Sequence, residues 1–110
     1  MALFMLLGKY SADAMKNILE TGSDREAAAR KAIEAAGGKL VGFYGMFGQE
    51  HNVAIIADVA GNAEYIGAIG PAIMSGAFSS FKSIPLYTSA EVTKASQIAK
   101  TVAEAYSPPK

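Results

Sequence analysis

Two neighbouring segments in the middle of the chain are apolar on both of their alternating faces. They are residues 39–47, KLVGFYGMF, and residues 52–59, NVAIIADV, and the short polar turn 48–52 joins them. A strand with one face in water alternates polar and apolar side chains, so strands without a polar face are covered on both sides. Two strands joined by a short turn form an antiparallel hairpin. Any fold of this chain must therefore place apolar cover on both faces of a central hairpin.

The segments around this hairpin predict an alternation of strands and helices. Ser11 and Ser23 are of the residue type that caps helix starts, and Ser23 opens a capping-box pattern. Gly37-Gly38 favours a left-handed helix end, and Pro85 favours an edge strand because proline lacks a backbone donor. Further strands are expected at 3–7 and 80–88, and helices between Ser11 and Gly22 and at 25–36, 63–77 and 89–106.

The order of these elements predicts the fold class. Strands separated by helices cross over and lie parallel, whereas the strands of the hairpin are antiparallel. The simplest sheet that satisfies both conditions is that of a ferredoxin-like α+β domain, βαββαβ, with helices on one face and an extra C-terminal helix. The chain has 110 residues, which suits one domain. We expect this domain to span residues 1–106, followed by a flexible tail at 107–110.

The composition indicates self-association. Apolar residues make up 51% of the chain, and charged residues make up 18%, below the quarter that is usual in globular proteins. A small domain with this composition exposes apolar surface, and the second face of the predicted sheet is apolar too. Packing two such sheets face to face covers both copies. We therefore expect a homodimer or higher homo-oligomer of the dimeric α/β-barrel type.

Other partners are disfavoured by charge and hydropathy. Ten basic residues balance ten acidic residues, so no basic field indicates nucleic-acid binding. The apolar run 2–7 is too short to cross a membrane, and no basic residues precede it as in a signal peptide. The chain contains no cysteine, which suits the reducing cytosol, and a cytoplasmic location is expected.

Several segments resemble the GYD-domain family. They are ALFMLLGKYSADAMKNI near the start, AAGGKLVGFYGMFG and NVAIIADV in the middle, and FKSIPLYTSAEV later in the chain. The resemblance implies a ferredoxin-like α+β fold similar to that of dimeric α/β-barrel proteins. It implies little about activity, because the family has mostly been described as of unknown function. The chain departs from the family in the turn 48–52, where Gly48 is followed by QEHN, Asn52 stands in place of the family's aspartate, and no tyrosine is present.

Two ionisable residues are candidates for chemistry. His51, the one histidine of the chain, is a candidate catalytic acid or base near neutral pH. Alternatively, it is a turn residue that is solvated or bonded to the backbone. With no cysteine, a single histidine does not complete a closed zinc site, and no metal is expected. Asp58 is either a buried carboxylate with a raised pKa or a cap of the turn that follows its strand.

The remaining candidates are residues that can surround a small ligand. In this interpretation Tyr10, Tyr44 and Tyr65, together with Asn52 and Asp58, supply polar groups to a pocket between sheet and helices. In the alternative interpretation the tyrosines are amphipathic residues at the rim of the core. The alanines of the helix at 25–36 are expected to pack closely on the sheet without a functional role.

Three functions remain open. The first is a binding or accessory protein for a small apolar or aromatic molecule held between sheet and helices. The second is a small cofactor-independent monooxygenase or isomerase that uses His51 or a tyrosine as acid or base, and the third is a structural self-assembly module. Whether the chain is an enzyme is left open, and no cofactor is expected. A cavity of a few hundred Å³ between the layers would favour the first two functions.

Overall fold

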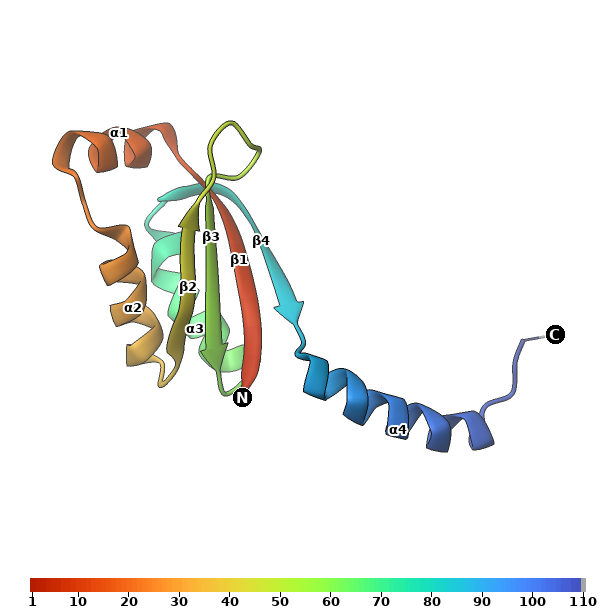
Figure 1. The fold of residues 1–110 in the computed structure, drawn as a ribbon. Coiled ribbons are helices and arrows are strands. Elements are labelled where there is room, and N and C mark those ends of the chain that lie inside the picture. Colours follow the sequence, from red (N-terminus) through yellow and green to blue (C-terminus); the bar gives the residue numbers. More distant parts are fainter. Residues whose placement is uncertain (110) are drawn as a thin grey trace.

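The computed structural model describes residues 1–109, in which strands and helices follow one another in the predicted order (Figure 1). The chain order places two helices between the first two strands and one helix between the last two. The strands are β1 (Ala2–Tyr10), β2 (Lys39–Gly45), β3 (Val53–Val59) and β4 (Phe78–Leu86), and the helices are α1 (Ala12–Thr21), α2 (Arg25–Ala35), α3 (Asn62–Met74) and α4 (Ser89–Ala105).

The four strands form one sheet in the order β2-β3-β1-β4, and every neighbouring pair is antiparallel. In the two central strands, Ala2 is paired with Val59 and Gly8 with Val53. Each helical connection skips over one strand, so the two strands that it joins are parallel but not adjacent. This arrangement confirms the ferredoxin-like α+β fold with a C-terminal helix. β4 lies at an edge of the sheet, as Pro85 predicts.

Capping residues set the boundaries of the first two helices. The hydroxyl of Ser11 accepts a hydrogen bond from the backbone N–H of Ala14, which confirms its predicted role. At α2 the cap is Asp24 and not Ser23, because the carboxylate of Asp24 accepts from the N–H of Ala27. Gly37 has a φ of +81°, so α2 ends through a left-handed glycine as expected.

The last strand begins and ends two residues earlier than its pattern predicts. Phe78 is already paired with Tyr10, and their rings stack with centroids 5.2 Å apart. At the other end Thr88 leaves the sheet, because its hydroxyl and the carboxylate of Glu91 form a reciprocal capping box at the start of α4. Local capping and one aromatic contact therefore decide both ends of β4.

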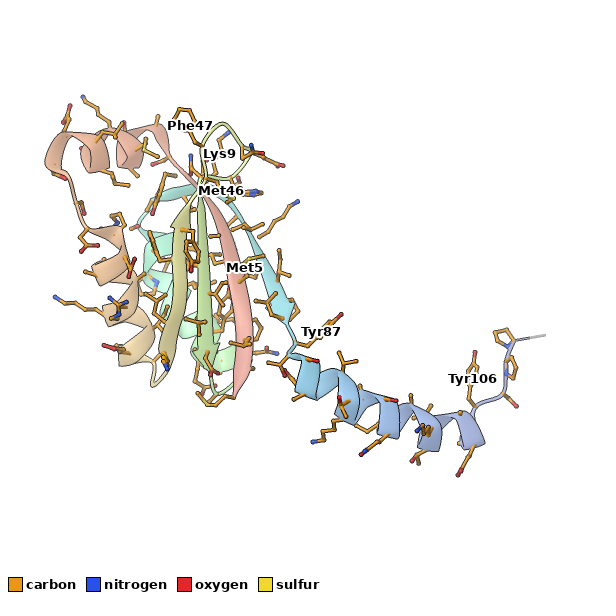
Figure 2. All side chains as sticks on the ribbon, in the orientation of Figure 1. Met5, Lys9, Met46, Phe47, Tyr87 and Tyr106 are labelled. Carbon is orange, nitrogen blue, oxygen red and sulfur yellow. The ribbon has the colours of Figure 1, made fainter. Side chains whose placement is uncertain are left out.

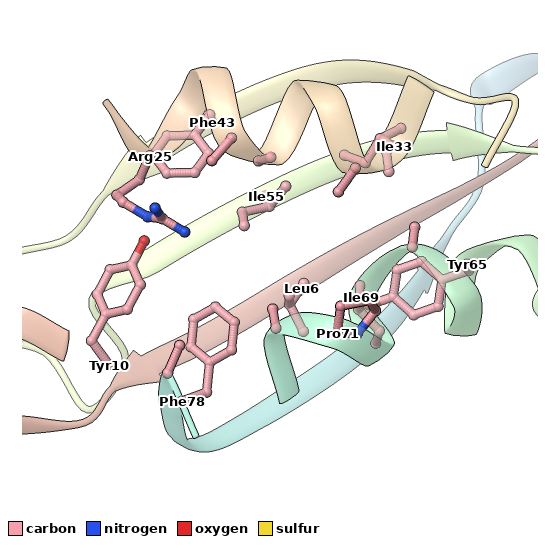
Figure 3. Close-up of a pocket in the computed structure, with 17 residues that line it drawn as sticks. Leu6, Tyr10, Arg25, Ile33, Phe43, Ile55, Tyr65, Ile69, Pro71 and Phe78 are labelled. Carbon is pink, nitrogen blue, oxygen red and sulfur yellow. The ribbon is translucent and has the colours of Figure 1, made fainter. Parts of the chain in front are cut away.

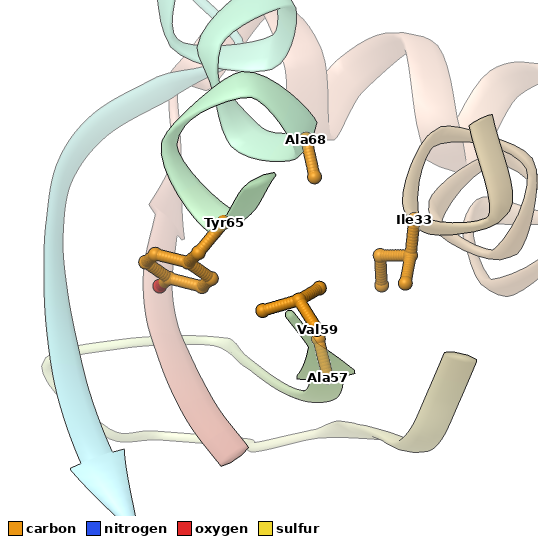
Figure 4. Packing of buried hydrophobic residues seen from close by; sticks show 5 residues of the cluster. All are labelled: Ile33, Ala57, Val59, Tyr65 and Ala68. Carbon is orange, nitrogen blue, oxygen red and sulfur yellow. The ribbon is translucent and has the colours of Figure 1, made fainter. Parts of the chain in front are cut away.

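Two helices cover one face of the sheet. α2 packs on β2 and β3, α3 packs on β3, and the two helices contact each other. α1 lies beyond one end of the sheet, and α4 leads away from it (Figure 1). The buried core lies between the two covering helices and β3 (Figure 4). Its members are Ile33, Ala57, Val59, Tyr65 and Ala68.

The opposite face of the sheet, which we call the outer face, is apolar at its centre, has Lys9, Lys39 and Lys82 nearer the strand ends, and carries no helix among residues 1–109. Met5 lies at its centre, paired with Ile56 of β3 and Ile84 of β4 (Figure 2 labels Met5). α4 has no buried residue, and Val102 on its surface is 55% exposed. In the same described part of the chain, no helix combines the length and the apolar character needed to cross a membrane.

The entry of the chain into β2 depends on a glycine. A Cβ at Gly38 would stand 2.6 Å from Cγ1 of Val59 and 2.7 Å from the carbonyl oxygen of Asp58. We expect Gly38→Ala to lower the free energy of unfolding by about 1–3 kcal/mol, because backbone and core must shift. As a control, Gly67→Ala in α3 meets nothing within 4 Å and should raise that free energy by up to about 1 kcal/mol. Urea unfolding measures both, and equal effects of the two variants would contradict this packing.

Candidate functional site

A cavity of about 310 Å³ lies between the two covering helices and the sheet (Figure 3). Ala28, Ala29 and Ala32 of α2 line it, as do Ala68 and Ala72 of α3. The prediction that the alanines of α2 pack closely on the sheet is therefore wrong for these three. A methyl group is too short to fill the space between the layers, and the alanines leave a gap that longer side chains would occupy.

The walls of the cavity are mostly aliphatic and aromatic. The larger apolar residues that line it are Leu6, Ile33, Phe43, Ile55, Ile69 and Phe78. At one end Ile33 and Tyr65 belong to the buried core, so the core closes that end. At the opposite end lie Tyr10, Arg25 and Phe78 (Figure 3). The cavity thus runs from a packed apolar end to an end with polar groups.

The polar end brings together a phenol and a guanidinium. The hydroxyl of Tyr10 and the guanidinium of Arg25 point toward one another (Figure 3). Arg25 carries the one charged side chain among the lining residues. Burial raises the pKa of the Tyr10 hydroxyl, and the nearby positive charge of Arg25 opposes that rise. Tyr10 is therefore a neutral hydrogen-bond donor at neutral pH.

Tyr65 contributes a second phenol at the packed end. Its hydroxyl is hydrogen-bonded to the hydroxyl of Ser83 at 2.8 Å, and its ring stacks on Phe4 with centroids 4.3 Å apart. Burial raises the pKa of this hydroxyl, and the hydrogen bond to Ser83 opposes the rise. Tyr65 is thus held by Ser83 at the packed end, whereas Tyr10 and Arg25 lie at the other end, where Arg25 is exposed and can meet an entering ligand.

The turn at residues 48–52, which contains the candidates His51 and Asn52, contributes no residue to the lining of the cavity. The amide oxygen Oδ1 of Asn52 accepts a hydrogen bond from the backbone N–H of Tyr10 at 2.8 Å. The backbone N–H of Asn52 donates to the carbonyl of Gly8 at 2.9 Å. Asn52 therefore ties the turn to the end of β1 and fixes the backbone of Tyr10. His51 beside it is buried, with 8% of its surface exposed.

Two further candidates, Tyr44 and Asp58, lie on the outer face. Their neighbours Phe43 and Ala57 line the cavity, and successive side chains of a strand point to opposite faces. Tyr44 is 64% exposed, while Oδ1 of Asp58 is buried and has no hydrogen-bond partner among the described residues. The structure therefore brings Tyr10 and Tyr65 to one cavity and separates the other predicted residues from it.

Within residues 1–109, no three histidine, aspartate or glutamate side chains gather as a metal site would require.

Sequence reasoning missed Arg25, although the chain carries a signal for it. Arg25 is the first residue of α2, and a cation in the first turn of a helix is disfavoured by the macrodipole. An arginine at such a position is a hint of a role outside the helix. Phe43 and Phe78 were missed for another reason, since each reads as an ordinary apolar residue of a strand.

Comparison with known proteins agrees with the resemblance noted in the sequence. A family model described as GYD domain matches residues 4–96, from β1 to the first half of α4. The matched range contains every residue that lines the cavity. Neither the curated proteins nor the solved structures give a match.

The contact between Tyr10 and Arg25 can be tested by titration. Removing the cation with Arg25→Met takes away a charge that favours the phenolate, so the pKa of Tyr10 should rise further above 10.0. ¹³C NMR of the tyrosine Cζ atoms at alkaline pH, assigned with Tyr10→Phe, measures this pKa. Lys31→Met removes a charge from the same helix outside the cavity lining and serves as the control. An unchanged or lower pKa in Arg25→Met would show that the two groups do not interact.

Proposed function

The chain belongs to the GYD domain family, and from this premise we propose that it is a homo-oligomeric binding protein for a small apolar or aromatic molecule. The cavity of about 310 Å³ supports the proposal most directly. Its volume falls at the lower end of the range of small-molecule sites, and such sites combine apolar walls with a few placed polar groups. We place this role in the cytoplasm, in keeping with the absence of cysteine.

The positions of the ionisable groups favour binding over acid–base catalysis. His51 is not among the residues that line the cavity, so it is not placed to exchange a proton with a molecule inside it. The phenols of Tyr10 and Tyr65 have raised pKa values and stay protonated at neutral pH. They are suited to donate hydrogen bonds and not to remove a proton.

Filling the cavity should abolish binding. Ala32 lines the cavity from α2, and Ala35 on the same helix does not. We expect Ala32→Trp to release a bound molecule because the indole ring occupies its space, whereas Ala35→Trp should leave binding intact. Native mass spectrometry of each protein, purified from the organism that makes it, reports a retained ligand and the number of subunits together.

Two-dimensional NMR with indole and p-cresol as probes extends this test to a protein purified without a ligand. Shift changes on the residues of β1, α2 and α3 that surround the cavity, absent in Ala32→Trp, are the expected result. No retained molecule and no shift changes with either probe would refute the proposed function.

Self-association is the second part of the proposal, and the outer face of the sheet supports it. The apolar residues on this face are Leu3, Met5, Leu7, Ala54, Ile56, Ile84 and Leu86. A second copy presents the same surface and can cover it by a two-fold, sheet-to-sheet contact. The formal net charge of zero adds no overall repulsion, and the lysines of this face, Lys9, Lys39 and Lys82, lie away from Met5 at its centre. A partner can also donate a hydrogen bond to the unpaired Oδ1 of Asp58.

The exposed surface of α4 also supports association with a second copy of the chain. It carries an apolar stripe in which Val92, Ile98 and Val102 are each at least half exposed. Tyr87 and Tyr106 flank this helix and are exposed as well (Figure 2). A 17-residue helix is marginal alone in water and gains stability when an apolar face is covered. In our proposal the stripe packs against the second copy.

A charge at the centre of the outer face should separate the copies. Analytical ultracentrifugation should find the wild-type chain as a dimer or higher oligomer. Met5→Lys should raise the dissociation constant by about a hundredfold or more, because a buried, unpaired ammonium costs several kcal/mol. Asn17→Lys on the exposed surface of α1 adds the same charge elsewhere and should have no effect. A monomeric wild type, or a Met5→Lys variant that remains associated, would contradict sheet-to-sheet association.

A further inference from the structure

The polar end of the cavity indicates the chemical class of the ligand. We propose that the ligand is a monoanionic carboxylic acid, with its carboxylate held by Arg25 and Tyr10 and its apolar body enclosed between α2, α3 and the sheet. This inference rests on the proposed binding function, which it deepens.

The charge of Arg25 is not compensated by the protein. The two carboxylates that flank it in the sequence are both engaged, since Asp24 caps the N–H of Ala27 and Glu26 pairs with Arg30 at 3.0 Å. Among the described residues no carboxylate lies within ion-pair distance of Arg25, and the groups that its guanidinium meets, the hydroxyls of Ser23 at 3.5 Å and of Tyr10, carry no charge. An anion in the cavity would supply the missing partner.

The start of α2 adds to this preference for an anion. Arg25 is the first residue of the helix, where unpaired backbone N–H groups carry partial positive charge. Arginine and helix terminus therefore place positive charge at the exposed mouth of an apolar cavity. A negative group at this mouth gains attraction from the guanidinium and from the helix start, which a neutral ligand does not.

The donors at this end match the shape of a carboxylate. A guanidinium presents parallel N–H groups that bind the two oxygens of a carboxylate together, and a phenol O–H can donate a third hydrogen bond. Tyr10 is held in place for this task. Its ring stacks on Phe78, and its backbone N–H is bonded to Oδ1 of Asn52. The predicted ligand residue Asn52 then acts through Tyr10, as a positioning residue.

The volume of the cavity and the single charge of Arg25 restrict the chemical class of the ligand further. A volume of about 310 Å³ suits a single ring or a short branched chain, and the walls around it are apolar. A phosphate monoester carries nearly two negative charges at neutral pH, and Arg25 would balance one of them. The second charge would find no further cation, because Arg25 is the one charged residue among those that line the cavity. A carboxylate carries the single charge that this site can balance.

The test compares matched ligands on the full chain. Isothermal titration calorimetry with 3-phenylpropanoate, 3-phenyl-1-propanol and phenyl phosphate should show the carboxylate bound about tenfold or more tightly than the alcohol, as expected for charge-assisted hydrogen bonds. Arg25→Met should reduce the affinity for the carboxylate to that for the alcohol. Arg25→Lys should keep part of the preference, because it retains the charge but loses the planar fork. Tyr10→Phe should weaken carboxylate binding more than alcohol binding.

Controls separate this inference from the function on which it rests. Arg25 is exposed although it lines the mouth of the cavity, so its variants should fold, and their urea midpoints check this. Lys31→Met on the same helix should keep the full preference. Alcohol binding as tight as carboxylate binding, with both lost in Ala32→Trp, would overturn the carboxylate assignment and leave the binding function standing. Tighter binding of phenyl phosphate would also overturn it, and binding of none of the three probes would overturn both proposals.

Discussion

The contact of Ile33 with β3 and with the entry into β2 sets the distance between the helical layer and the sheet. Ile33 and Val59 are almost fully buried, and a Cβ at Gly38 would stand only 3.1 Å from Cγ2 of Ile33. The layers therefore touch at this end of the sheet (Figure 4). Further along α2 the facing residues are alanines such as Ala28, which do not span the same distance. The cavity exists because Ile33 holds α2 in contact with the sheet at one end, while the alanines further along the helix are too small to fill the space that remains.

The turn between β2 and β3 has a structural role, because it fixes the end of β1 beside the cavity. Asn52 bonds the end of β1 through two hydrogen bonds, one to the N–H of Tyr10 and one to the carbonyl of Gly8. Gly8 has no room for a Cβ because the ring of Phe78 lies against it. Turn, strand end and aromatic stack thus hold the Tyr10 ring at the cavity. The segment that departs most from the family's motif supports the cavity without lining it.

Much of the fold could be predicted because its signals are local. Ser11, Gly37 and Pro85 each act through their own backbone geometry, and apolar alternation marks the central hairpin without knowledge of its surroundings. The start of β4 was displaced because the pairing of Phe78 with Tyr10 is a long-range contact, and its end was displaced by the capping box of Thr88 and Glu91, a local signal that the pattern of the strand does not contain.

The site was less predictable because it depends on contacts between residues that are distant in the chain. Tyr10 and Tyr65 were expected to meet a ligand, and both line the cavity, but the role of Arg25 depends on a neighbour that is distant in the chain. Tyr44 and Asp58 were assigned to the same site although strand alternation places them on the other face of the sheet. Spacing alone also did not show that the alanines of α2 leave a gap instead of a packed interface.

The spacing of the two layers creates the cavity, and the unpaired charge of Arg25 at its mouth selects a carboxylate. A crystal structure of the full chain with 3-phenylpropanoate tests this most directly. We expect the phenyl ring among the alanines of α2 and α3 and the carboxylate within hydrogen-bond distance of Arg25 and Tyr10. Helices packed directly on the sheet with no cavity, or a ligand bound with its carboxylate away from Arg25, would contradict this.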